Sequence, residues 1–239
     1  MISANTKKEN ESIYVLHTYP FKETSLIAEL FSKNYGRISV IAKGARRPRS
    51  SLRGMLQSFQ LLEATWSGKN EIKTLHNIEW CDKFLNVEGG SLLCGFYINE
   101  LIIRLLPRED THQKLFEFYH HTMKMLEKDI NLDIALRRFE LNLLQELGYE
   151  VPLKEDENGE SIIADKFYMY EADYGPAEVS KTKNGIKIYG KTLLDMANDE
   201  YAENKTQLQS KQLMRYLINH YLGDKPLNSK KLFTNIQDN

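Results

Sequence analysis

Cysteine is scarce in this chain of 239 residues, and its scarcity excludes two kinds of small stabilised fold. Cys81 and Cys94 are too few for a disulfide framework or for a four-thiolate zinc site. We interpret both as ordinary structural thiols, and we expect neither a metal nor a cofactor.

Long apolar runs are also missing. The longest, from Phe96 to Leu106, is interrupted by Asn99, Glu100 and Arg104 and is shorter than the ~20 residues that a membrane span needs. The N-terminal segment MISANTKKENE is polar and lacks the apolar core of a secretory signal. The sequence therefore predicts a cytoplasmic protein without a membrane segment.

Motifs for catalysis are few. The histidines show no zinc-binding spacing, and no G-x-S-x-G elbow is present. Gly185 to Thr192 formally matches the phosphate-binding loop G-x-x-x-x-G-K-[ST], but Ile186 to Tyr189 favour an extended strand over a loop that wraps phosphate. We expect no enzyme, and nucleotide hydrolysis through Lys191 is the alternative.

Acidic residues are absent between Glu29 and Glu63, although the formal net charge of the whole chain is only −1. That stretch carries seven cations: Lys33, Arg37, Lys43, Arg46, Arg47, Arg49 and Arg53. Because salt screens charges beyond about 8 to 10 Å, a local excess of this kind attracts polyanions whatever the net charge. We predict DNA binding by the last six of these residues, with a solvated surface loop as the alternative.

The first third of the chain predicts five short strands separated by turn residues. Their expected ranges are 12–19, 25–32, 37–43, 59–66 and 71–76, with turns at Asn34-Tyr35-Gly36 and Ser67-Gly68-Lys69-Asn70. Five strands in so short a stretch favour an oligonucleotide-binding (OB) barrel, with residues 44–57 as an exposed loop. Several aromatic side chains could stack bases or belong to the core: Tyr14, Tyr19, Phe21, Tyr35 and Phe59.

Beyond Cys81 the apolar period changes to that of helices, so we expect an OB domain over residues 1–82 and a mostly helical domain over 83–239. Helices are predicted up to Pro107, from an Asp110 cap to about Leu126, and from Asp133 to Leu147, where Gly148 ends the helix. Residues 150–190 are predicted to form a small β insertion with a tight turn at Asn184-Gly185. Helices resume near Leu193. The fold class is α+β.

Several separate segments of the chain form one ordered pattern. In chain order they are Val15-Leu-His, Glu23-Thr-Ser-Leu, Gly36-Arg37, Ala42-Lys-Gly-Ala-Arg46, Leu56-Gln57, Lys73-Thr-Leu, Tyr97-Ile-Asn-Glu-Leu, Leu136-Arg-Arg-Phe-Glu140, Leu147-Gly-Tyr and Leu222-Gly-Asp-Lys-Pro-Leu-Asn-Ser. Together they resemble the RecO family of bacterial recombination mediators. Each segment is weak alone, but their order and spacing run nearly from end to end. The resemblance implies binding of single- and double-stranded DNA and annealing of complementary strands. An RNA-binding OB protein, which would share the charge pattern, is the alternative.

The resemblance also implies partners and a nucleoid-associated place in the cell. These partners are RecR and the single-stranded-DNA-binding protein, with which RecA is loaded in recombinational repair. Arg137 and Arg138 would then hold the partner's acidic C-terminal tail, since an arginine fork suits a carboxylate; an ion pair with Glu140 or a neighbouring helix is the alternative. A second basic surface is predicted to extend the DNA path through Lys211 and Arg215, with a solvated face as the alternative; it comprises Lys211, Arg215, Lys225, Lys230 and Lys231.

One departure concerns the insertion. Many relatives carry a four-cysteine zinc site where residues 150–190 of this chain hold no cysteine. The insertion should therefore be metal-free and rest on packing, with Phe167, Tyr168 and Tyr170 as the expected anchors.

Overall fold

The computed structural model describes residues 7–179, 185–223 and 227–229. Five strands form a closed barrel in the order β1-β2-β3-β5-β4: β1 (Lys8–Phe21), β2 (Ser25–Ser32), β3 (Gly36–Ala42), β4 (Leu62–Ser67) and β5 (Ile72–Trp80). Strand β1 pairs with both β2 and β4, and a bulge between Val15 and His17 bends it so that the barrel closes. Only the β3–β5 pair is parallel. The predicted OB-type barrel and both predicted turns are confirmed.

Alternation along the strands fills the barrel with apolar side chains. The buried set is Ile13, Val15, Ala28, Leu30, Ile38, Val40, Ala42, Ala45, Leu56, Leu62, Ala64, Trp66, Leu75 and Ile78. Two members, Ala45 and Leu56, come from the segment between β3 and β4, which also contains the short helix α1 (Leu52–Met55). Because this segment contributes to the core, the loop expected over residues 44–57 is anchored at two points.

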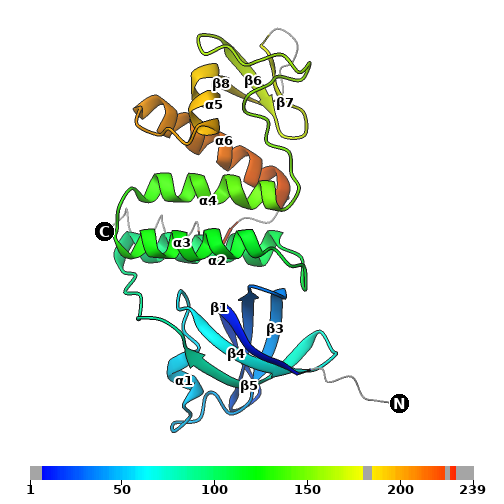
Figure 1. Ribbon diagram of the computed structural model, residues 1–239, viewed down its shortest axis with the longest axis vertical. Helices are drawn as coiled ribbons and strands as arrows, with labels where there is room; N and C mark the ends of the chain where they lie inside the picture. Colours follow the sequence, from blue (N-terminus) through cyan, green and yellow to red (C-terminus); the bar gives the residue numbers. More distant parts are fainter. Residues whose placement is uncertain (1–6, 180–184, 224–226, 230–239) are drawn as a thin grey trace. The chain divides into compact units, whose positions relative to one another are not determined.

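Helices α2 (Gly89–Leu105) and α3 (Gln113–Glu127) lie on one side of the barrel, away from α1 (Figure 1). They cover an aromatic layer on the outside of β1 and β2, in which Tyr14 meets Tyr119 edge-on at 4.7 Å and Phe31 lies 5.4 Å from Phe116, measured between ring centroids. The buried Asn99 amide donates to the carbonyl of Leu16 at 2.9 Å. Such contacts join the helices and the barrel into one compact unit, which extends to Asp129 and includes the described residues 227–229.

A buried carboxylate holds the chain between α2 and α3 against the barrel. Glu29 is 4% exposed and accepts hydrogen bonds from Arg37 and Arg108, each at 3.1 Å, and a short one from Ser39. The start of the second predicted helix differs from expectation: α3 begins at Gln113 with His112 at the N-cap position, not after an Asp110 cap. The backbone of Asp110 packs against Gly36 instead.

The second compact unit, Ile130–Pro226, contains three helices and a three-stranded sheet among its described residues. The elements are α4 (Leu132–Glu146), β6 (Phe167–Glu171), β7 (Gly175–Glu178), β8 (Ile186–Tyr189), α5 (Gly190–Ala197) and α6 (Asn204–Leu222). Helix α4 ends as predicted, with Gly148 at φ 81° and its N–H bonded to the carbonyl of Gln145. None of the described helices is long and apolar enough to span a membrane.

The insertion sheet has the order β7-β6-β8, so its hairpin is β6–β7, and β8 returns along the other edge of β6. Asn184 of the predicted Asn184-Gly185 turn lies outside the described residues. Tyr168 and Tyr170 are buried anchors, 4% and 0% exposed, as expected. Phe167 is not an anchor: its side chain is 44% exposed, because neighbouring residues of a strand face opposite sides.

Gly36 provides a test of how closely the segment between α2 and α3 packs against β3. It has φ 62°, and a Cβ atom there would lie 1.8 Å from the carbonyl oxygen of Asp110. Gly36→Ala should therefore lower the free energy of unfolding by about 2 to 4 kcal/mol, measured by denaturant titration. Gly54→Ala is the control, since a Cβ atom meets nothing within 4 Å there. Equal stability of the two variants would contradict the close contact.

Candidate nucleic-acid interface

A basic loop, defined as residues 43–57, connects β3 to β4 and is shaped by a run of successive turns. The backbone N–H of Arg47 bonds to the carbonyl of Gly44 at 3.0 Å, and that of Ser50 to Arg47 at 3.0 Å. The backbone N–H of Arg46 also reaches Thr24 across to the β1–β2 turn, at 2.8 Å. Together with the buried Ala45, these bonds hold the basic side chains on a defined backbone.

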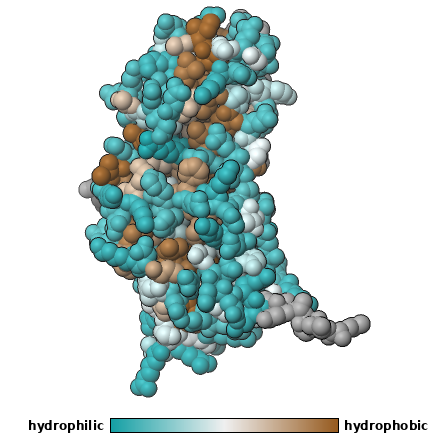
Figure 2. Space-filling model, viewed as in Figure 1, coloured by the Kyte–Doolittle hydropathy of each residue, from teal (hydrophilic) through white to brown (hydrophobic). Residues whose placement is uncertain are grey.

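Five of the seven cations between Glu29 and Glu63 extend from this loop into solvent. All are exposed, and within residues 7–179, 185–223 and 227–229 none of them forms an ion pair: Lys43, Arg46, Arg47, Arg49 and Arg53. The end of the barrel that carries the loop shows hydrophilic side chains in the view of Figure 2. The loop therefore presents unneutralised positive charge that is free to contact phosphates.

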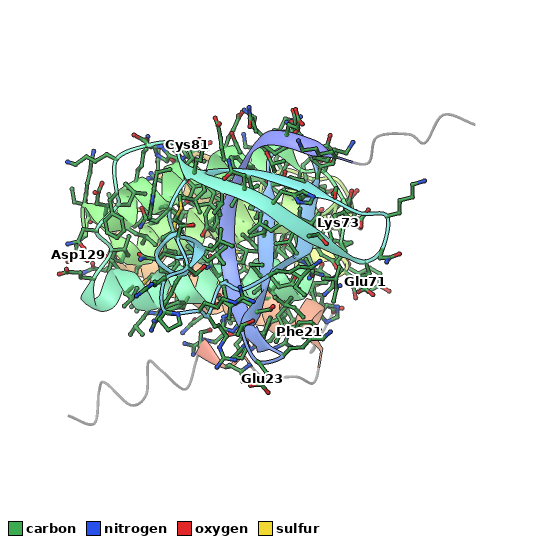
Figure 3. The ribbon with its side chains drawn as sticks, turned by 90° about the horizontal axis from the view of Figure 1, so that it is seen from below. Phe21, Glu23, Glu71, Lys73, Cys81 and Asp129 are labelled. Atoms are coloured by element: carbon green, nitrogen blue, oxygen red, sulfur yellow. The ribbon has the colours of Figure 1, made fainter. Side chains whose placement is uncertain are left out.

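Lys22 adds a sixth cation that sequence reasoning missed. It lies in the β1–β2 turn, its side chain is exposed, and its carbonyl accepts a hydrogen bond from the guanidinium of Arg46 at 3.2 Å. Figure 3, which views the protein from below, labels Phe21 and Glu23, the two chain neighbours of Lys22 at that turn. Glu23 follows Lys22 directly, so a search for stretches without acidic residues could not find Lys22. The available signal is the position of Lys22 in a β-turn.

The other two cations of the acid-free stretch are already paired. Lys33 contacts Glu117 at 3.1 Å. Arg37, predicted to bind DNA, instead donates to Glu29 at 3.1 Å and to the carbonyl of Leu106 at 2.9 Å, and its side chain is 13% exposed. Its guanidinium stabilises the fold, so we leave Arg37 out of the proposed surface.

Most of the aromatic side chains considered for base stacking are inside the barrel unit. Tyr14 and Phe59 are buried, and Tyr35 packs edge-on against Trp66 at 5.6 Å. Phe59 adopts φ 71° and packs onto α2, where a Cβ on Gly95 would lie 2.7 Å from its ring. Of the set, Tyr19 is clearly exposed, at 43%.

The predicted basic residues of α6 differ in their surroundings. Lys211 pairs with Asp133 at 3.0 Å, whereas Arg215 is exposed and has no ion pair within the part of the chain that the structure describes. Lys225, Lys230 and Lys231 lie outside the described residues. Arg215 is thus the described cation of this group that is available to a ligand.

The two arginines of α4 also differ from one another. Arg137 is buried and forms a two-pronged ion pair with Glu140, both bonds at 2.6 Å. Arg138 lies closer to solvent, with 39% of its side chain exposed, and bonds to Asp199 at 2.6 Å. A carboxylate from a partner would therefore reach Arg138 more readily than Arg137.

The segment that matches a phosphate-binding loop does not have the shape of one. Residues Ile186–Tyr189 form strand β8, as the sequence predicted. Lys191 contacts Asp195 at 2.8 Å and Glu203 at 3.2 Å, and these hydrogen bonds raise its pKa, so its charge is already neutralised. Within the described residues no group of three or more His, Cys, Asp or Glu side chains could hold a metal.

Arg37 tests the division between structural and ligand-binding cations. Arg37→Ala should lower the free energy of unfolding by about 2 to 3 kcal/mol, because it removes charged hydrogen bonds from a buried carboxylate. The salt dependence of DNA binding should stay unchanged in the folded variant. Thermal unfolding and a salt titration of DNA affinity measure the two effects. Unaltered stability with a shallower salt dependence would return Arg37 to the DNA surface.

Comparison with known proteins covers almost the whole chain. Family models for the N-terminal and C-terminal parts of recombination protein O match residues 7–84 and 88–231. The chain is 47% identical over 237 residues to the DNA repair protein RecO of Nitrosospira multiformis, covering 97% of each chain. It is 42% identical to that of Dechloromonas aromatica and 43% identical to that of Aromatoleum aromaticum, covering 99% of this chain and 100% of each relative. The chain therefore belongs to the RecO family of DNA repair and recombination proteins.

Proposed function

We propose that the chain binds single- and double-stranded DNA through the basic loop of its barrel and anneals complementary strands. The observation that carries the proposal is the set of five exposed loop cations without an ion pair among the described residues. DNA strands repel each other through their phosphates, and cations that neutralise phosphates on both strands allow them to approach. No covalent bond is broken in this process, and the proposal includes no catalysed reaction.

The proposal extends to the loading of RecA in the cytoplasm, on nucleoid DNA. Family membership supports a mediator that acts with RecR on DNA covered by the single-stranded-DNA-binding protein. Such a mediator needs one surface for DNA and another for the covering protein. The loop cations lie in the barrel unit and Arg138 lies in the second unit, so the two contacts use different parts of the chain.

The electrostatic claim is tested by a salt titration of single-stranded DNA binding. Four or five neutralised phosphates give a slope of log affinity against log salt between about −3 and −3.5. The triple variant Arg46→Ala/Arg47→Ala/Arg49→Ala should bind DNA of any sequence more weakly, with a slope shallower by about 2. It should also anneal complementary oligonucleotides more slowly.

A matched control removes the same charge elsewhere in the barrel unit. Lys69, Lys114 and Lys128 are exposed, and Lys69→Ala/Lys114→Ala/Lys128→Ala should keep the native slope. A native slope near zero would refute electrostatic binding. Unchanged affinity in the arginine variant would move the site elsewhere.

The partner contact is tested at Arg138. We propose that the acidic tail of the single-stranded-DNA-binding protein competes with Asp199 for this guanidinium. Arg138→Ala should weaken binding of a peptide with that tail sequence several-fold and leave naked DNA binding unchanged. Asp199→Asn should strengthen peptide binding, since it releases Arg138, and asparagine tolerates the φ of 61° at this position. Fluorescence anisotropy of labelled peptide measures both, and equal losses of peptide and DNA binding in Arg138→Ala would contradict separate sites.

A further inference from the structure

One exposed and one half-buried aromatic ring, together with two lysines that have no ion pair among the described residues, meet at the insertion sheet, far in sequence from the basic loop. Phe167 of β6 and Tyr189 of β8 are directly opposite each other in the strand register, and their ring centroids are 5.0 Å apart. Phe167 is 44% exposed and is the first residue of its strand. The core of the sheet does not use this ring.

Two ammonium groups lie over these rings. The Nζ atom of Lys205, from α6, is 3.3 Å from the Tyr189 centroid and 5.3 Å from that of Phe167. The Nζ atom of Lys187, from β8, is 4.8 Å from the Phe167 centroid. Since both lie beside one ring, they are separated by no more than roughly a Debye length at cellular salt, about 8 to 10 Å, and repel each other.

The carboxylates of this neighbourhood have other partners. Asp165 accepts the hydroxyl of Tyr189 at 3.0 Å. Asp195 and Glu203 hold Lys191. Within the part of the chain that the structure describes, Lys187 and Lys205 form no ion pair, so the aromatic faces are their main described contacts.

We propose that this surface, formed by Phe167, Tyr189, Lys187 and Lys205, is a second contact for single-stranded DNA. An unpaired base would stack on Phe167, and the lysines would turn to the flanking phosphates. The exchange is favourable because stacking of a base on an aromatic side chain is stronger than an exposed cation–π contact. Bases in a duplex are already stacked and paired, so the surface selects single strands.

This inference rests on the proposed binding of DNA but concerns a separate part of the chain. It gives the insertion a role that needs no metal: β6 and β8 present the rings, and α6 supplies a lysine. Strand annealing benefits from the second contact. A base that stacks on Phe167 keeps its hydrogen-bonding edge free, so it remains available to a complementary strand.

The test compares affinities of the full chain for oligo(dT) and for a duplex of equal length. Phe167→Ala should weaken oligo(dT) binding about fivefold or more and leave the duplex unchanged, whereas Phe167→Trp should retain or improve oligo(dT) binding. Lys187→Ala/Lys205→Ala should weaken oligo(dT) and reduce the salt slope by about 1.4. Lys128→Ala/Lys154→Ala is the charge-matched control, and thermal unfolding confirms that each variant folds.

A positional readout separates this inference from the proposal for the barrel. Oligo(dT) carrying 5-iodouracil should photocrosslink to Phe167 or Tyr189, identified by peptide mass, and should do so even in the Arg46/Arg47/Arg49 alanine variant. Native affinity and a native salt slope in the Arg46/Arg47/Arg49 alanine variant, with the crosslinks retained, would refute the basic loop alone. Equal oligo(dT) affinity of Phe167→Ala and the native chain, without crosslinks at either ring, would overturn the second contact. Tight binding of an acidic aromatic peptide to the same rings, with oligo(dT) unaffected, would likewise overturn it in favour of a protein ligand.

Discussion

The barrel unit depends on one buried carboxylate. Glu29 lies on β2 and would be costly to bury as an isolated charge, but Arg37, Arg108 and Ser39 all donate to it. Arg37 reaches it from the neighbouring strand, and Arg108 from the segment after α2, 79 residues away in the chain. The same segment places Asp110 against Gly36, so the ion pairs and the close backbone contact act at one point. Helices α2 and α3 thereby belong to the barrel.

This arrangement divides the positive charges by task. Arg37 and Arg108 form ion pairs with the buried Glu29, and Lys33 pairs with Glu117 of α3. The cations of the basic loop follow β3, at the point where the chain leaves the sheet, and none of them has an ion pair within the described part of the chain. Since Ala45 and Leu56 return to the core, the arginines between them face solvent. The positive charges of this loop are therefore not neutralised by ion pairs within the described fold and remain available to a ligand.

In the second unit, unlike the basic loop, several cations are paired with carboxylates. Arg137, Arg138, Lys191 and Lys211 all have carboxylate partners, and Arg137 with Glu140 is inside the unit. Its insertion is held by Tyr168 and Tyr170, with the side chain of Tyr170 0% exposed. The burial of these two rings anchors the insertion sheet. Their neighbour Phe167 is left on the outer face with Tyr189 and two lysines.

Local rules determined much of this protein. Alternation and turn residues predicted the barrel strands, Gly148 predicted the end of α4, and the stiffness of Ile186–Tyr189 predicted a strand where a phosphate loop was the alternative. The absence of acidic residues between Glu29 and Glu63 identified the loop cations. These features depend on residues close in sequence, so the sequence by itself determined them.

Only the tertiary structure decided which individual side chains are paired, buried or exposed. The sequence places Arg37 in a strand and Arg46 in a loop, but it does not show that the Arg37 guanidinium is paired. Its contacts with the distant carbonyl of Leu106 and with the carboxylate of Glu29 do. Phe59 was predicted to begin the fourth strand, but its backbone is left-handed and its ring packs against the distant Gly95. Phe167 and Lys205 come together because β8 returns to the free edge of β6 and α6 follows. Such outcomes depend on partners dozens of residues away, whose positions follow from how the whole chain packs.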